Sequence, residues 1–98
     1  MKRLAHVEAN GKQDDVRWGI LCRSIHDVLA LERVFRERAI WYDLVPVPRT
    51  LSPDCGMAIE FLPADSAAVR ELLAASSVKT RGTYRRTPSG CTQQALPE

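Results

Sequence analysis

The chain has 98 residues, 45% of them hydrophobic and 27% charged, which predicts one globular domain and leaves no room for a second. Fourteen Lys and Arg against twelve Asp and Glu give a net charge of +2, a balance that predicts nothing about partners. The apolar runs are too short to span a membrane, and His6 and Glu8 interrupt the N-terminal segment, which excludes a secretory signal and predicts a cytoplasmic protein.

The first regular element expected is a strand. Residues 1–14 are polar without a clear period, so we expect them to form a loose N-terminal arm. The next stretch alternates, with Val16, Trp18, Ile20 and Cys22 on one face. This pattern is typical of a strand with one buried side.

An amphipathic helix should follow from Ser24. Ser24 and Asp27 approximate a capping box, with Asp in place of the usual Glu. Apolar residues recur at helical spacing, and charged residues cover the other side; the apolar set is Val28, Leu31, Phe35 and Ala39. The spacing predicts a helix of about four turns.

The second half of the chain predicts two strands, a helix and a final strand. The segment Leu44–Pro48 is extended but holds two prolines, which places it at a sheet edge. Met57–Leu62 alternates as a strand, and Asp65 can cap a second helix. Val78–Arg86 is a weaker strand whose charges suit an edge, and 88–98 should be a disordered tail.

This order predicts an α+β, ferredoxin-like βαββαβ sandwich over residues 15–87. Two helices would cover one four-stranded antiparallel sheet, with the first and third strands in the middle. The second and fourth strands would then form the edges, in agreement with the prolines of the one and the charges of the other.

The topology gives Cys55 a special environment. Antiparallel pairing of the first and third strands brings Cys22 toward Cys55, at the end of the sheet where the helix from Ser24 begins. Arg49 and His26 belong to the same end. Helix N-termini and nearby cations lower the pKa of a thiol, which predicts a nucleophilic thiolate able to hold a persulfide. From the residues alone, a small turn residue is an equally good interpretation of Cys55.

The sequence resembles the family of small proteins called putative Se/S carrier protein-like. The matching pieces are Ser24-Ile25-His26-Asp27, Leu44-Val45-Pro46-Val47-Pro48-Arg49 and Ser52-Pro53-Asp54-Cys55-Gly56-Met57-Ala58. The resemblance implies that Cys55 carries sulfur or selenium, with Arg49 and Gly56 framing it. One departure is Ala39, which stands where a Gly would be expected to end the helix.

The resemblance also implies partners. A sulfur or selenium donor, such as a cysteine desulfurase, would load Cys55, and an acceptor enzyme would unload it. We therefore expect a carrier and not a stand-alone enzyme. The two histidines have no metal-ligand spacing and no C-x-x-C pair exists, so the sequence predicts neither a metal nor a cofactor.

The remaining cysteines and His26 each have two interpretations. Cys22 is a buried core residue or, as the sharper alternative, a resolving partner that forms a disulfide with Cys55. Cys91 lies in the expected tail, where it is incidental. His26 is a surface residue or a proton donor to Cys55.

Two other classes of function stay open. Lys79, Arg81, Arg85 and Arg86 form a basic patch that suits a solvated edge or contact with nucleic acid. Binding of RNA through the sheet is disfavoured, because the aromatic residues share the face assigned to the core. The open face carries Leu21, Ala58 and Leu62 and could instead support a homodimer in a regulatory or assembly module.

Overall fold

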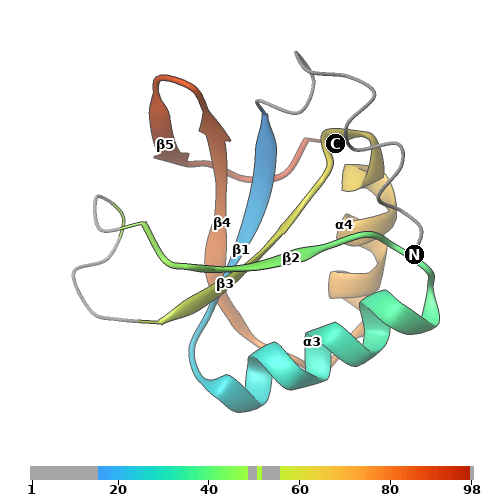
Figure 1. Cartoon of the computed structure of the whole chain (residues 1–98). Coiled ribbons are helices and arrows are strands. Elements are labelled where there is room, and N and C mark those ends of the chain that lie inside the picture. Colours follow the sequence, from blue (N-terminus) through green and yellow to red (C-terminus); the bar gives the residue numbers. More distant parts are fainter. Residues whose placement is uncertain (1–15, 49–50, 52–55, 98) are drawn as a thin grey trace.

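A computed structural model of the chain describes residues 16–48, 51 and 56–97 (Figure 1). In chain order it contains β1 (Arg17–Cys22), α3 (Ile25–Glu37), β2 (Asp43–Pro46), β3 (Met57–Phe61), a short 3-10 helix (Pro63–Asp65), α4 (Ser66–Ala75), β4 (Thr80–Thr87) and β5 (Gly90–Gln93). The predicted succession of strand, helix, strand, strand, helix and strand is confirmed. None of the helices in these described ranges is long and apolar enough to cross a membrane. The predicted arm, residues 1–14, lies outside the described residues.

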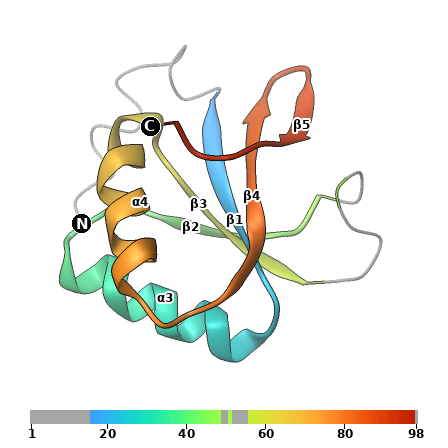
Figure 2. The same cartoon turned by 180° about the vertical axis from the view of Figure 1, so that it is seen from behind.

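The strands form one antiparallel sheet in the order β2-β3-β1-β4-β5. Strands β1 and β3 are central, and they pair with Trp18 opposite Phe61 and Ile20 opposite Ile59. Because successive side chains of a strand point to opposite faces, these four residues share one face. Both helices cover that face, as the two opposite views show (Figures 1 and 2). The ferredoxin-like arrangement predicted from the sequence is therefore confirmed.

The C-terminal part of the sheet corrects two expectations. The sequence predicted four strands with β4 at an edge and a disordered tail from residue 88, but β5 pairs with β4 and takes the edge position. A tight hairpin joins the two strands, and Gly90 adopts a φ of 141°, which favours glycine. After β5 the chain stays attached, because the Gln94 amide donates to the Thr83 carbonyl oxygen over 3.0 Å. Residues 88 and 89, expected to begin a disordered tail, instead form the turn of this hairpin.

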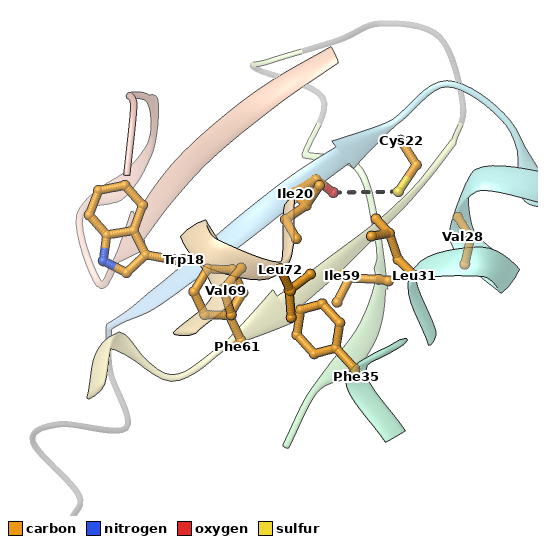
Figure 3. Packing of buried hydrophobic residues seen from close by; sticks show 10 residues of the cluster. All are labelled: Trp18, Ile20, Cys22, Val28, Leu31, Phe35, Ile59, Phe61, Val69 and Leu72. Atoms are coloured by element: carbon orange, nitrogen blue, oxygen red, sulfur yellow. Dashed lines mark hydrogen bonds between the residues drawn. The ribbon is translucent and has the colours of Figure 1, made fainter. Parts of the chain in front are cut away.

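The main core lies between the helices and the sheet (Figure 3). Its members come from the alternating positions of β1 and β3 and from the apolar stripes of α3 and α4. They are Trp18, Ile20, Cys22, Val28, Leu31, Phe35, Ile59, Phe61, Val69 and Leu72. The period-two and helical spacings of the sequence thus identified this layer.

Helix α3 has well-formed ends. The Ser24 hydroxyl accepts a hydrogen bond from the Asp27 amide over 3.4 Å, as expected of an N-cap. At the other end, Ala39 has a φ of 57°. The Ile40 amide donates to the Phe35 carbonyl oxygen over 2.9 Å, and the Ala39 amide donates to that of Arg36 over 3.1 Å. These two bonds form a Schellman motif, so Ala39 occupies the position that usually holds Gly.

Candidate functional site

A hollow of about 540 Å³ lies where β1 ends and where α3 and β3 begin; we call it the sheet-end hollow. The described residues around it come from five parts of the chain. They are Leu21, Cys22, Arg23, Ser24, Ile25, Val28, Val47, Leu51, Gly56, Met57, Arg81 and Gln93. The topology argument from the sequence pointed to this end of the sheet.

The sheet-end hollow gathers some of the predicted site residues. Gly56 and Cys22 line it, and Arg81 joins them from β4. Cys55 and Arg49, the other predicted members, lie outside the described residues. Their roles therefore stay predictions.

His26 lies on another side of α3. It lines a second hollow, of about 580 Å³, between α3 and the C-terminal end of α4; we call this the interhelix hollow. Its neighbours there include Leu29, Ala30 and Leu72. The predicted role of His26 as a proton donor to Cys55 gains no support from this position.

A β-bulge directs Arg81 to the sheet-end hollow. Leu21 pairs with Gly82 and Cys22 pairs with Thr80, so Arg81 is the extra residue of β4. Gly82 beside it has a φ of 128°, a conformation that L side chains rarely adopt. Bulges re-aim a side chain and often occur next to functional sites. Arg81, predicted only as part of a basic patch, thus belongs to this site.

The charges described around the sheet-end hollow are both positive. Arg23 and Arg81 are the ionisable groups that line it besides the Cys22 thiol. Arg23 also pairs with Asp27 across 3.4 Å, with its side chain 53% exposed. The first turn of α3 adds backbone N–H groups, at the positive end of the helix dipole. Asp27 compensates the charge of Arg23, so Arg81 and the start of α3 are the groups here that favour an anion.

The thiol of Cys22 is poorly suited to nucleophilic chemistry. Its side chain is buried in the main core, and its Sγ lies 3.9 Å from the Ile20 carbonyl oxygen (Figure 3). Burial, with a smaller contribution from the Asp27 carboxylate, raises the pKa of Cys22 to about 11. The core interpretation of Cys22 is therefore favoured over that of a resolving partner.

The face of the sheet opposite the helices holds a polar network that the sequence analysis missed. Glu60 is 2% exposed, and the hydroxyl of buried Tyr84 donates to its Oε2 over 2.6 Å. The Arg86 guanidinium donates to both carboxylate oxygens, over 2.9 Å to Oε2 and 2.6 Å to Oε1. Gly19 lies between Glu60 and Tyr84 in the register, and the Tyr84 ring occupies the space above it. A glycine inside an alternating strand was the available signal, since such glycines mark a close approach.

The predicted basic patch is dispersed. Arg86 is bound to Glu60, and Arg81 lines the sheet-end hollow. Arg85 directly precedes Arg86 in β4, so the side chains of these two residues point to opposite faces. Lys79 is exposed before the strand begins. This arrangement does not offer a nucleic acid one continuous row of cations.

Two of the three residues proposed for a homodimer contact are buried within the chain. Leu21 and Ala58 are 5% and 0% exposed, and Leu62 is half-buried. Leu21 and Ala58 pack with Tyr84 and with half-buried residues that include Cys91. Cys91 is thus part of β5 and of this packing, and not an incidental tail residue. Burial is the main cause that raises the pKa of Cys91.

The described ranges contain no group of three or more His, Cys, Asp or Glu residues that could hold a metal ion. The ionisable groups at the sheet-end hollow are two guanidiniums and one buried thiol. Such a set suits an anionic ligand better than a metal cation.

Comparison with known proteins identifies a family. The model of the family described as "Putative Se/S carrier protein-like" matches residues 17–85, which is more than two thirds of the chain. No curated protein and no solved structure matches the chain.

Proposed function

This chain belongs to the family described as "Putative Se/S carrier protein-like", and from this membership we propose that Cys55 holds a sulfur or selenium atom in transit between two enzymes. The observation that carries the proposal concerns Gly56, which follows Cys55 in the chain and lines the sheet-end hollow. Cys55 is therefore bonded directly to a residue that lines the hollow. The charged side chains described around this hollow are those of Arg23 and Arg81.

The sheet-end hollow suits an anionic sulfur. The thiolate, and not the thiol, is the nucleophile, and nearby cations and helix N-termini favour it. Arg81 supplies a cation that no carboxylate among the described residues pairs with, whereas Asp27 compensates Arg23. The first turn of α3 supplies N–H donors. The same groups favour the anion of a persulfide, whose terminal sulfur carries the charge.

The loading step is an exchange at sulfur. The Cys55 thiolate attacks the terminal sulfur of a donor enzyme's cysteine persulfide, and a new S–S bond forms on Cys55. The donor's own S–S bond breaks, and its electron pair leaves on the donor cysteine as a thiolate. Unloading repeats the exchange with an acceptor thiolate, and Cys55 leaves with its electron pair. No net oxidant or reductant is needed, because the transferred atom keeps its oxidation state.

The chain acts in this scheme as a carrier and not as a stand-alone enzyme. Arg49 and Gly56 would frame the loaded sulfur. Cys22 takes no part, because its raised pKa keeps the thiol protonated at neutral pH. The chemistry that generates the persulfide belongs to the donor enzyme.

Mass spectrometry of the intact protein tests the proposal. We expect incubation with a cysteine desulfurase and cysteine to add the mass of sulfur to the wild-type chain, at Cys55. The adduct should be absent from Cys55→Ser and unchanged in the matched control Cys91→Ser. Unlabelled Cys55, or equal labelling of Cys22 and Cys91, would contradict the carrier function.

A further inference from the structure

Helix α3 exposes two large aliphatic side chains on consecutive turns. Ile25 is 56% exposed and Leu29 is 55% exposed, and the other exposed large hydrophobic residue in the described ranges, Leu44, lies on β2. Residues four apart on a helix lie on the same side, so Ile25, Leu29 and Arg33 form one stripe. We call these three residues the α3 stripe.

The α3 stripe connects the two hollows. Ile25 lines the sheet-end hollow, whereas Leu29 and Arg33 line the interhelix hollow. Apolar side chains also line the interhelix hollow, among them Val34 and Leu72. A partner on this stripe would therefore bury apolar surface at the edge of the hollow that Gly56, the residue after Cys55, also lines.

The charges beside the α3 stripe are unevenly compensated. The acidic groups Asp27 and Glu32 are paired with Arg23 and Arg36, across 3.4 and 3.9 Å. Arg33 and Arg38 line the interhelix hollow, and neither has a carboxylate within ion-pair distance among the described residues. Glu37 is the one acidic residue described around that hollow. The surface thus combines exposed aliphatic groups with a surplus of guanidinium charge.

Resting on the carrier function proposed above, we propose that the α3 stripe is the docking surface for the sulfur donor. The complementary donor surface carries apolar side chains flanked by carboxylates, next to its persulfide cysteine. Charge complementarity favours this occupant over a second copy of the chain, which would bring the same cationic surplus to the contact. Docking there would hold the donor's persulfide beside the sheet-end hollow during the exchange.

Kinetics of persulfide transfer test this surface. The full-length chain and the variants Leu29→Gln and Arg33→Glu are loaded by a cysteine desulfurase with cysteine, over a range of carrier concentrations. We expect each substitution to raise the half-saturating carrier concentration by about fivefold or more, as loss of an interface contact does. The matched control is Arg70→Glu, because Arg70 is exposed on α4 and does not line either hollow. Loading of Cys55 by inorganic polysulfide should be the same in all variants.

The outcomes separate this proposal from the one on which it rests. A desulfurase that loads wild type and both variants with equal half-saturation would overturn the docking surface and leave the carrier function intact. An effect of Arg33→Glu without one of Leu29→Gln would also overturn it, because general electrostatic attraction would then suffice. Failure of both desulfurase and polysulfide to load wild-type Cys55 would contradict the carrier function, and the donor surface with it.

Discussion

The side chains on the two faces of the sheet are held in place by different interactions. The face under α3 and α4 is packed with aliphatic and aromatic side chains that need no particular partner. On the other face, Tyr84, Glu60 and Arg86 form a hydrogen-bonded network that fixes each group relative to the others. Apolar packing tolerates exchange of one hydrophobic side chain for another, whereas a buried carboxylate depends on every donor that it has.

Removing Glu60 should have the largest effect. Glu60→Ala leaves the Tyr84 hydroxyl buried without its acceptor and the Arg86 guanidinium without its carboxylate. Breaking a buried pair costs about 3–5 kcal/mol, and we expect a loss of about 3 kcal/mol because the Arg86 side chain is 43% exposed. Urea unfolding measures the change, with exposed Glu71→Ala of α4 as the control. A loss no larger than that of the control would contradict a stabilising role for the Glu60 network.

The two described cysteines report on the two faces by their reactivity. Burial on the helix side raises the pKa of Cys22 to about 11, so its thiolate at pH 8 should be roughly a hundredfold rarer than that of an ordinary thiol near 9.0. Cys91 on the other face is half-buried and should react faster. Timed alkylation of the Cys55→Ser chain, followed by peptide mass spectrometry, compares them. Similar rates at pH 8 would contradict this ordering.

The same pKa has a consequence for stability. The folded protein holds the Cys22 proton more tightly than the unfolded chain does. Unfolding therefore releases a proton from about pH 9 to pH 11, and stability should fall over that window. Cys22→Ala should remove this part of the alkaline dependence.

Gly19→Ala tests the close contact on the face opposite the helices. An added Cβ would overlap the Tyr84 ring, whose hydroxyl is held by Glu60, so the ring must move and its hydrogen bond must lengthen. Overpacking of this kind costs about 1–3 kcal/mol, measured by urea unfolding. Combining Gly19→Ala with Tyr84→Ala should cost less than the sum of the two single changes. Strict additivity would mean that the ring and Gly19 are not coupled.

The smallest expected effect is a gain in the free energy of unfolding from a substitution at Ala39, after the end of α3. Ala39 has a φ of 57°, where an L residue is strained by about 1–2 kcal/mol. Ala39→Gly removes the strain but raises the conformational entropy of the unfolded chain, so we expect a net stabilisation of about 0.5–1 kcal/mol. Thermal unfolding should show a higher midpoint, and exposed Ala67→Gly within α4 serves as a control expected to lower it. A midpoint unchanged by Ala39→Gly would contradict the strain.

The sequence predicted the sheet face under α3 and α4 well, because the patterns that specify this face are local in the chain. Alternation in β1 and β3, the cap at Ser24 and the missing glycine at Ala39 all act within a few residues. The opposite face depends on which residues become neighbours across strands, and Tyr84 reaches Glu60 only because both flank Gly19. The bulge at Arg81 is equally non-local, because it is defined by the pairing of β4 with β1. The sequence therefore did not predict that Arg81 lines the same hollow as Cys22 and Gly56.

The contact between Gly19 and the Tyr84 ring also constrains how this protein can evolve. A larger residue at Gly19 is tolerated only after Tyr84 has been replaced by a smaller one, so the order of the two substitutions matters. Loss of Tyr84 first removes a hydrogen-bond donor from the Glu60 carboxylate, so an uncharged residue becomes favourable at position 60. Arg86 would then lose its ion-pair partner. Gly19, Glu60, Tyr84 and Arg86 should consequently be inherited together, as a group that is either kept whole or replaced whole.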